Sequence, residues 1–339
     1  MHSNNRVMPW KFEKDPYKIW LSEIILQQTR VAQGTAYYNR FIKKYPAIEK
    51  LAKAKEAEVF KLWEGLGYYS RCRNLMATAT LIHEKYKNVF PSTYKEILSL
   101  KGVGPYTAAA IASFGFDLPY AVVDGNVMRV LSRFFGIFTP IDTTLGKKTF
   151  NELAQLLLDP KQPAQYNQAI MDFGATVCKP QSPLCNQCPL SQNCLAFKKK
   201  SVDILPKKSK KIIVKQRFFN YFLLEVGSFI LIKPRTHKDI WKGLHEFLLS
   251  ETSSQVSTKD AMKKLSEEIG LSDKKTIEVS KLYKQKLTHQ EITARFIRVQ
   301  LDAIPSELSS FFVQKKQLKK IAFPKIITEY LEEAIFINT

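Results

Sequence analysis

The chain has 339 residues, of which 45% are hydrophobic, and its 52 Lys and Arg against 31 Asp and Glu give a formal net charge of +21. This length predicts two or three domains with sizeable cores. The positive charge favours a polyanionic partner, most simply nucleic acid. Because the chain has no run of about 18 apolar residues, we expect no membrane span. Residues 1–10 lack the apolar core of a secretion signal, so a reducing, cytoplasmic location fits best.

The first periodic segment, residues 19–33, has the pattern of an amphipathic helix. One face carries residues at three- to four-residue spacing, which are Leu21, Ile24, Ile25 and Gln28. Glu23 and Gln27 are four residues apart and would share a neighbouring face with Leu26 and Arg30. From this pattern alone, a lone glutamate such as Glu23 is usually solvated.

Residues 36–86 continue as helices, with short breaks at Pro46 and at residues 65–67. Residues 63–73, Trp-Glu-Gly-Leu-Gly-Tyr-Tyr-Ser-Arg-Cys-Arg, interleave aromatic and arginine side chains. Aromatic rings can fill the gap left by an extruded base while arginines meet phosphates. Buried aromatics beside a glycine turn are commoner, however, so this segment alone predicts core. Cys72 is expected to be a plain buried thiol.

Two glycines separate apolar helical patterns at residues 100–107, Leu-Lys-Gly-Val-Gly-Pro-Tyr-Thr. Gly102 and Gly104 predict a tight helix-to-helix turn, and Pro105 suits the first position of the next helix. The free backbone amides at such a helix start can bind a phosphate. Further on, Asp124 precedes a basic amphipathic run to Arg133, and its most common role is that of an N-cap.

Helical patterns at residues 150–158 and 166–176 lead into a cysteine-rich loop. Its spacing is C-x6-C-x2-C-x5-C, formed by Cys178, Cys185, Cys188 and Cys194. Such clustering in a large intracellular chain favours a metal site over disulfides. Zinc and a 4Fe–4S cluster can both be bound by four cysteines.

The last part of the chain predicts a smaller α+β domain after a polar, Lys-rich linker at residues 201–216. Two β-type runs around a Gly turn, residues 218–224 and 228–232, predict a hairpin. The other expected elements are an amphipathic helix at 258–269, a strand at 291–301 and a terminal helix at 323–336.

Together, the glycine turn, Asp124 and the cysteine loop resemble the endonuclease III superfamily of DNA base-excision glycosylases. Residues 22–29, Ser-Glu-Ile-Ile-Leu-Gln-Gln-Thr, resemble the Glu-x-x-Leu-Gln-Gln-Thr motif of its MutY-type adenine glycosylases. This resemblance covers almost the whole chain and is densest in the first half.

The resemblance implies that Glu23 is the general acid and that an ionised Asp124 stabilises a cationic sugar, with Asn126 and Tyr106 orienting the pair. Lyase members carry a Schiff-base lysine at the position of Tyr106, so a monofunctional, hydrolytic enzyme is implied. The expected substrate or DNA contacts are Gln28 as a wedge, Tyr68 as an intercalator beside the opposite base, Gln168 against the adenine, and Arg30, Gly102 and Gly104.

The resemblance also implies an all-α helix-hairpin-helix glycosylase core with an iron–sulfur cluster loop, followed by a smaller α+β Nudix-like domain. A six-helix barrel would span residues 22–131, and a 4Fe–4S cluster domain would combine residues 1–21 and 132–197. A linker at 198–216 would lead to the Nudix-like domain at 217–339. The four cysteines would be the cluster ligands.

Residues 241–247, Trp-Lys-Gly-Leu-His-Glu-Phe, resemble a segment of Nudix-like domains, and residues 263–271 resemble a degraded Nudix box. Lys264 stands where the box has a catalytic glutamate, and Gln255 and Leu249 replace further box residues. Because a lysine opposes metal binding, we expect no nucleotide hydrolysis.

The implied partner is double-stranded DNA in which adenine is mispaired with 8-oxoguanine or guanine, bound by a monomer near the nucleoid. Thr288 and His289 align with the family's 8-oxoguanine-reading Phe-Ser-His loop, from which the aromatic residue is lost. A second departure is Lys11, where the family usually has Arg. Two alternatives stay open: a bifunctional glycosylase/AP lyase, and a non-catalytic iron–sulfur protein that binds DNA.

Overall fold

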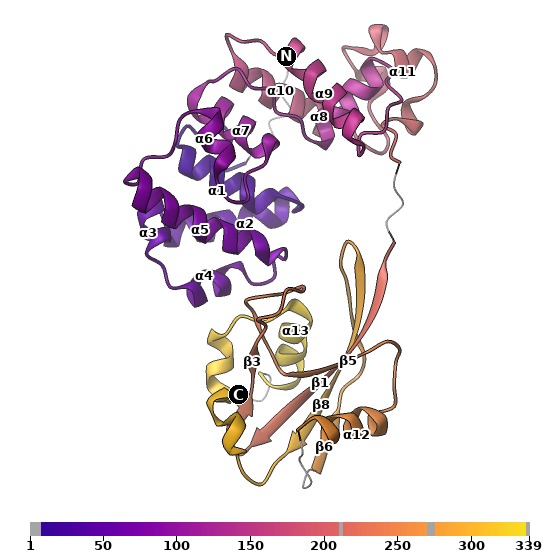
Figure 1. Cartoon of the computed structure of the whole chain (residues 1–339). Helices are drawn as coiled ribbons and strands as arrows, with labels where there is room; N and C mark the ends of the chain where they lie inside the picture. The colour runs from indigo at the N-terminus through magenta and orange to yellow at the C-terminus, as the bar shows by residue number, and fades with distance from the viewer. Residues whose placement is uncertain (1–7, 210–212, 270–274, 337–339) are drawn as a thin grey trace. The chain divides into compact units, whose positions relative to one another are not determined.

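The structure is a computed structural model that describes residues 8–209, 213–269 and 275–336. The chain divides into two compact units (Figure 1). The first comprises Met1–Ala54 and Arg73–Lys211, and the second comprises Lys55–Cys72 and Ile212–Thr339. The expected division of the first half into a barrel and a cluster domain stays a prediction.

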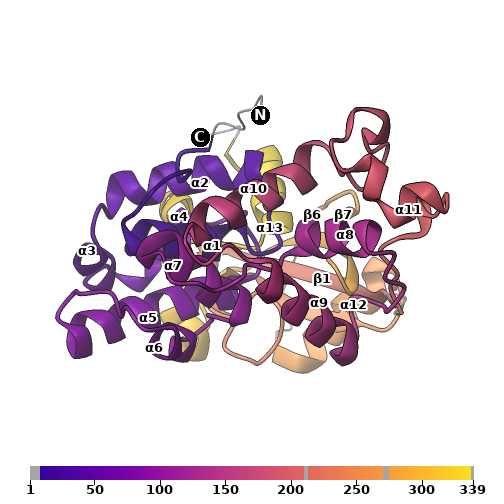
Figure 2. The same cartoon turned by 90° about the horizontal axis from the view of Figure 1, so that it is seen from above.

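In the described residues of the first unit, all regular secondary structure is helical (Figure 2). Its helices are α1 Pro16–Leu26, α2 Val31–Lys44, α3 Ile48–Ala52, α6 Tyr94–Ser99, α7 Pro105–Phe116, α8 Gly125–Phe134, α9 Thr144–Leu157, α10 Pro163–Thr176, α11 Leu195–Lys198 and the part of α5 (Tyr69–Tyr86) from Arg73 onward. Helix α7 is the centre of this unit, because the side chains from Thr107 to Ser113 are all buried and α1 packs along it.

The predicted helix at residues 19–33 is confirmed as far as Leu26, where α1 ends, but its continuation was wrong because a break separates α1 from α2, which begins at Val31. The side chain of Gln27 turns toward the glycine loop, where Nε2 donates to Gly102 O and Thr107 Oγ1, each at 3.3 Å. Gln28 then adopts a left-handed φ of 57°, which no helix can continue. Gln28 is therefore exposed rather than on the apolar face.

The glycine turn forms as predicted between α6 and α7. Gly102 has φ 79°, and an added Cβ would lie 2.9 Å from Asn74 Cβ, so this position requires glycine. Pro105 occupies the start of α7. Asp124 caps α8 by accepting from Val127 N at 2.8 Å, also as predicted.

The loop after α10 is held by short turns and by α8. It contains η1 Cys185–Gln187, η2 Ser191–Asn193 and η3 Val202–Ile204. Residues predicted as linker pack here instead: Leu205 is buried and its carbonyl accepts from Arg133 Nε at 3.1 Å. Helix α9 starts earlier than predicted because Thr143 caps it, accepting from Gly146 N at 3.0 Å.

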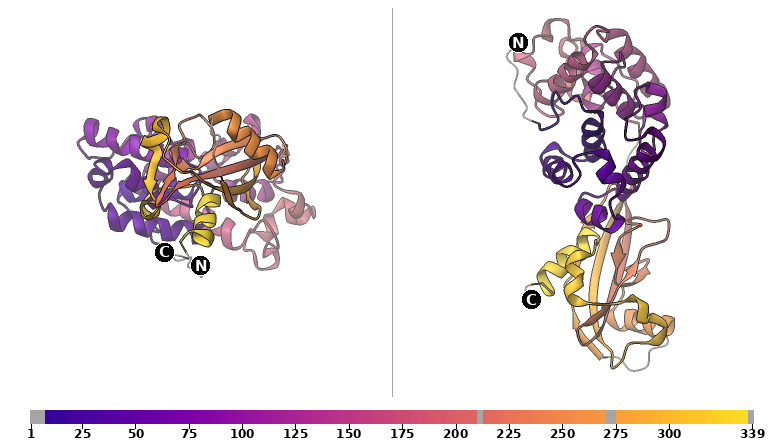
Figure 3. Two further views of the ribbon diagram at one scale, coloured as in Figure 1. Left: turned by 90° about the horizontal axis from the view of Figure 1, so that it is seen from below. Right: turned by 90° about the vertical axis from the view of Figure 1, so that its left-hand side faces the viewer.

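The second unit is built on a seven-stranded sheet (Figure 3). The strands are β1 Lys215–Val226, β2 Phe229–Leu231, β5 Leu248–Thr252, β6 Lys275–Val279, β7 Tyr283–Lys286, β8 Gln290–Gln300 and β9 Phe312–Gln314, with a separate pair β3 Lys233–Pro234 and β4 His245–Glu246. The strand path β6-β8-β1-β2-β9 places β8 parallel to β1 at its centre. The predicted hairpin is the antiparallel β1–β2 pair.

Two helices of the second unit pack on this sheet. Helix α12, Thr258–Ile269, matches its predicted range and buries Ala261 and Leu265 against Phe222 and Ile297. The terminal helix α13, Lys325–Ala334, starts two residues later than predicted and packs near β7. Gly270 and Leu271, the end of the degraded Nudix box, lie outside the described residues. Two remaining turns are η4 Ser306–Phe311 and η5 Lys315–Lys320.

Residues 55–72, although early in the chain, belong to the second unit. They form α4, Glu56–Trp63, and the turn into α5. The Glu64 carboxylate accepts from Phe323 N at 2.8 Å and from Thr328 Oγ1 at 3.3 Å. Lys61 Nζ donates to Ile321 O at 3.0 Å. The Glu64 carboxylate therefore places a negative charge near the N-terminus of α13, where it is favourable.

Candidate active site

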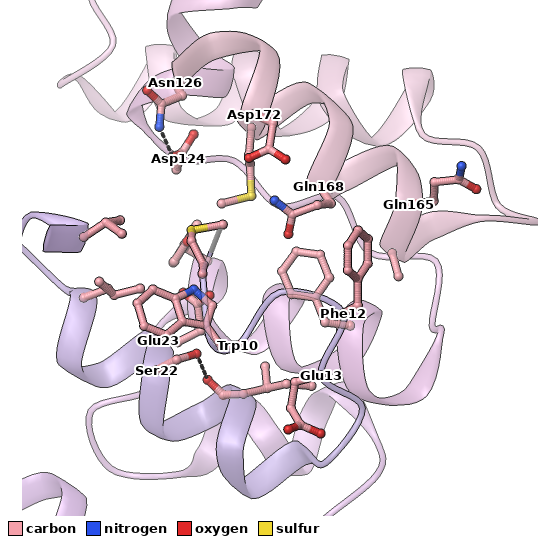
Figure 4. A pocket seen from close by; sticks show the side chains of 18 of the residues that line it. Trp10, Phe12, Glu13, Ser22, Glu23, Asp124, Asn126, Gln165, Gln168 and Asp172 are labelled. Carbon is pink, nitrogen blue, oxygen red and sulfur yellow. Dashed lines mark hydrogen bonds between the residues drawn. The ribbon is translucent and has the colours of Figure 1, made fainter. Parts of the chain in front are cut away.

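A pocket of about 700 Å³ opens in the first unit, large enough for a single base (Figure 4). Its wall includes six residues that the sequence selected, which are Glu23, Arg30, Tyr106, Asp124, Asn126 and Gln168. They come from α1, α7, the start of α8, α10 and the α1–α2 turn. The fold therefore brings together residues that are distant in sequence.

Glu23 lies on α1 with only 7% of its surface exposed. The expectation from the helical pattern alone, a solvated glutamate, was thus wrong. Burial raises the pKa of Glu23 to about 7, with a smaller contribution in the same direction from the nearby charge of Asp124. A hydrogen bond with Tyr106 acts in the opposite direction. A carboxyl group with this pKa carries a proton for part of the time near neutral pH.

Asp124 is held by hydrogen bonds at both carboxylate oxygens. Oδ1 accepts from Val127 N at 2.8 Å, and Oδ2 accepts from Asn126 Nδ2 at 2.6 Å. Asn126 is fixed in turn, because Arg129 Nη2 donates to Asn126 Oδ1 at 2.8 Å. The site thus presents one buried carboxyl group of raised pKa and a second, oriented carboxylate, a pairing that allows opposite protonation states.

Two buried arginines that the sequence reading did not select connect α8 to the cysteine loop. Arg129 Nε donates to Cys178 O at 2.7 Å, and Nη2 donates to Gly174 O at 2.7 Å. Arg133 donates to Lys179 O at 2.7 Å and lies 3.4 Å from Cys178 Sγ. The sequence did contain a signal for them, because both arginines lie among apolar residues of a helix. An arginine in such a position is rarely buried unless it is paired, so it indicates a structural contact.

The four cysteines of the loop border one small pocket together with Arg133. Their mutual proximity is evident electrostatically, because burial and the charges of Cys178, Cys188 and Cys194 all raise the pKa of Cys185. In the described ranges no three His, Cys, Asp or Glu side chains are placed as a ready metal-ligand group. The donor set itself, four thiols around one cavity beside a cation, fits a four-cysteine iron–sulfur cluster.

The other predicted DNA contacts of the first unit are at least partly accessible to solvent. Gln28 is exposed and Gly102 is exposed, while Gly104 is half-buried with open space around its Cα. Lys11, which departs from the family's Arg, forms an ion pair with Asp172 at 2.9 Å. Asp172 and Gln168 both line the pocket.

The remaining predicted residues meet in the second unit. Tyr68 is 46% exposed with a left-handed φ of 48°, and its hydroxyl forms a hydrogen bond with Thr288 Oγ1. Thr288 and His289 are exposed between β7 and β8. Residues chosen from two separate motifs, Tyr68 from one and Thr288 and His289 from the other, therefore form one exposed patch within this unit.

Comparison with known proteins identifies the class. Residues 21–157 match the family described as HhH-GPD superfamily base excision DNA repair protein, and residues 220–333 match the NUDIX domain. A solved structure of a thermostable thymine-DNA glycosylase shares 32% identity and a TM-score of 0.54, covering 58% of this chain and 91% of that one. The first half is thus a helix-hairpin-helix DNA glycosylase fold.

The individual relatives indicate a narrower class of enzyme than the family models do. An adenine DNA glycosylase of Buchnera aphidicola subsp. Schizaphis graminum is 33% identical over 336 residues, covering 98% of this chain and 95% of that protein. The adenine DNA glycosylase of Homo sapiens is 44% identical over 200 residues, covering 56% of this chain and 37% of that protein. This chain belongs to the adenine DNA glycosylase family. The enzymes of this type generally carry a 4Fe–4S cluster.

None of the helices within the described ranges combines the length and the apolar character that crossing a bilayer requires.

Proposed function

We propose that this chain hydrolyses the N-glycosidic bond of adenine mispaired with 8-oxoguanine or guanine in duplex DNA, and that it does so as a monomer. The observation that carries the proposal is the pairing of a buried Glu23, with a pKa of about 7, and an oriented Asp124 in one base-sized pocket. An adenine DNA glycosylase relative that aligns with nearly the whole chain supports the same proposal.

Glu23 supplies the proton that adenine needs in order to leave. It donates to N7 of the extruded base, the bond between C1′ and N9 breaks, and the electron pair of that bond goes to the purine. Because adenine is a poor anionic leaving group, general acid catalysis of this kind contributes roughly 10²–10⁴ in rate. Extrusion itself costs a few kcal/mol, less for a mispaired base.

Asp124 faces the sugar, which gains oxocarbenium character as the base departs, as in glycoside hydrolysis by two carboxylates. Its negative charge stabilises this cation, or bonds to it transiently, until water adds to C1′. The water proton then passes to Glu23 or to solvent. Asn126 and Tyr106 orient the two carboxyl groups, and Gln168 contacts the adenine.

The decisive experiment is single-turnover excision with Glu23→Gln and Asp124→Asn. Glu23→Gln cannot deliver a proton and should lose at least 10²-fold. Asp124→Asn removes a preorganised charge worth about 3–4 kcal/mol and should lose 10²–10³-fold. Exposed Glu152→Gln and Asp203→Asn are matched controls that should excise like the wild type. Unchanged rates in both site variants would refute the mechanism, and an inert wild type on every adenine mispair would favour the DNA-binding alternative.

The lyase alternative depends on an amine at the sugar, and the chain offers Tyr106 at the position that carries the lyase lysine in other superfamily members. A phenol cannot form an imine. Borohydride should therefore trap no covalent protein–DNA adduct, and strands should stay intact until base is added. Efficient trapping would instead support the bifunctional reading.

The iron–sulfur cluster would be held by the thiolates of Cys178, Cys185, Cys188 and Cys194, with Arg133 beside Cys178. When bound, it supplies a rigid, positively flanked scaffold for the loop. Purified protein should be brown, with about four iron and four sulfide per chain. Cys185→Ser should lower both contents together, whereas a colourless protein with one zinc would overturn the assignment.

The base opposite the adenine would be read in the second unit. We assign this role to the exposed patch of Tyr68, Thr288 and His289, with Tyr68 inserting beside the opposite base. The degraded Nudix box would then serve as scaffold, without nucleotide hydrolysis. On the other unit, Gln28 would enter the duplex, and Arg30 and the amides after Gly102 and Gly104 would contact phosphates.

A further inference from the structure

Phe12 is the most exposed large apolar side chain that borders the pocket. Its side chain lines the same pocket as Glu23 and Asp124 (Figure 4), yet 79% of the residue is accessible to solvent. The other aromatic wall residues are less exposed: Trp10 and Phe114 are only partly accessible. A phenyl ring that projects into solvent at the rim of a binding pocket contributes little to folding, because little of its surface is removed from water.

The backbone at Phe12 is also unfavourable for this residue. Its φ is 66°, in the left-handed region that costs a non-glycine residue roughly 1–2 kcal/mol. The turn that imposes this angle is closed by Glu13 N donating to Trp10 O at 3.2 Å and by Lys11 N donating to Met8 O at 3.0 Å. Glycine or asparagine would fit the turn better, so neither burial nor backbone preference explains a phenylalanine here.

The neighbours of Phe12 are firmly anchored, which fixes where the ring can lie. Trp10 packs edge-on against Tyr38, with ring centroids 5.2 Å apart. Lys11 Nζ forms an ion pair with Asp172 and also lies 5.3 Å from the centroid of the Phe12 ring. Glu13 pairs with Lys18 at 3.2 Å. The turn therefore holds one aromatic face at the pocket rim while the residues on either side are immobilised.

We infer that Phe12 is a substrate-contact residue whose ring stacks on the purine as it enters the pocket. This inference rests on the proposed function and adds a binding surface for the extruded base. A purine presents a flat π-face, and stacking on an aromatic side chain is worth about 1–3 kcal/mol per base. Stacking of the base would offset the energy cost of the left-handed turn and of the exposed ring.

The test uses the full-length protein with Phe12→Ala, Phe12→Leu and Phe12→Trp. Affinity is measured on two duplexes that differ at one site: one carries a 2′-fluorinated adenosine that resists cleavage, and the other an abasic tetrahydrofuran. Phe12→Ala and Phe12→Leu should weaken binding to the first duplex by roughly 5- to 150-fold and leave the second unchanged. Phe12→Trp keeps an aromatic ring and should bind the first duplex like the wild type. Phe138→Ala, which removes an exposed phenylalanine outside the pocket, is the matched control.

The outcomes separate the two proposals. If the wild type excises adenine but the alanine and leucine variants bind both duplexes like the wild type, the stacking role is refuted and the proposed function stands. Equal weakening on both duplexes would assign Phe12 to general DNA contact and also refute it. A lower thermal midpoint for Phe12→Gly would show a structural role, whereas stacking predicts an unchanged or higher midpoint. A wild type that does not excise adenine would refute the proposed function itself.

Discussion

Asn126 Nδ2 donates a hydrogen bond to Asp124 Oδ2 at 2.6 Å, and the same asparagine receives a bond from Arg129 Nη2 at 2.8 Å. The amide therefore cannot flip without losing both contacts. This fixes which atom of Asn126 faces Asp124 and keeps the carboxylate pointing in one direction. Asn126 also packs closely against Gly174, because a Cβ added at Gly174 would lie 2.8 Å from Asn126 Cβ.

Replacing Asn126 with alanine should slow excision without unfolding the protein. The change removes a hydrogen bond to a charged group, worth about 1.5–3 kcal/mol, so the single-turnover rate should fall roughly 10- to 100-fold. Duplex affinity should stay within twofold, since Asn126 contacts Asp124 rather than DNA. Asn151→Ala, on the exposed surface of α9, provides the comparison. A rate equal to that of this control would show that Asp124 does not depend on its partner.

Excision should decline as the pH rises through about 7, the pKa of Glu23. The reaction requires protonated Glu23, so above this pKa the active fraction drops about tenfold for each pH unit. Tyr106 cannot cause this decline because burial raises its pKa well above its usual value. A single-turnover pH profile provides the measurement, and in Glu23→Gln the decline should disappear. A wild-type profile that is flat from pH 6 to 9 would contradict the role of Glu23.

The same group should make stability depend on pH. The pKa of Glu23 is raised from 4.5 to about 7 by burial, so the folded state retains the proton longer than the unfolded state does. Its favourable contribution is complete below pH 4.5 and is lost as the pH rises to about 7. Glu23→Gln should therefore unfold like the wild type at pH 4 and be more stable at pH 8, by about 2–3 kcal/mol. Urea titrations at pH 4 and pH 8 measure the free energy of unfolding of both proteins. The same difference between variant and wild type at both pH values would contradict a raised pKa of Glu23.

The two glycines of the α6–α7 turn should respond differently to alanine. Gly102→Ala introduces a Cβ that meets Asn74 and places alanine at φ 79°, so stability should fall by about 1–3 kcal/mol. Gly104 has nothing within 4 Å of an added Cβ, so Gly104→Ala should fold normally. If the backbone here approaches a phosphate, Gly104→Ala should still weaken duplex binding several-fold. Normal binding by a folded Gly104→Ala would remove this turn from the DNA interface.

Thr288 should control the choice between 8-oxoguanine and guanine opposite the adenine. Thr288→Val keeps the shape but loses the hydroxyl that contacts Tyr68, and should reduce the excision preference for 8-oxoguanine by about 5- to 10-fold. Thr288→Ser retains the hydroxyl and should behave like the wild type. The ratio of the two excision rates is the measurement. An unchanged ratio in Thr288→Val would remove this loop from reading of the opposite base.

The sequence predicted most elements whose ends are set by local chemistry. The turn at Gly102, the cap at Asp124 and the helix at 258–269 follow from residue types within a few positions. The break after Leu26 was missed because it depends on Gln27 reaching the distant Gly102 carbonyl. Helix α9 was predicted too short because the capping role of Thr143 was not recognised.

The candidate site was predictable to the extent that motifs carry it. Glu23 and Asp124 were selected from matching segments, but the burial that raises the pKa of Glu23 is a property of the packed helices. Arg129 and Phe12 belong to no selected motif, and their roles depend on contacts that only the folded chain creates. The parallel pairing of β1 with β8 likewise joins segments far apart in sequence, so periodicity could give each strand but not its neighbour.

The attachment of residues 55–72 to the second unit bears on how such proteins can evolve. Lys61 and Glu64 make their hydrogen bonds with the backbone of Ile321 and Phe323 and with Thr328. A recombination event between the two halves of the gene would separate α4 from the C-terminal residues that it contacts. Chimeras that exchange the C-terminal half between relatives should therefore need residues 55–72 from the same parent. Substitutions in residues 55–72 should also co-vary with substitutions at their C-terminal partners.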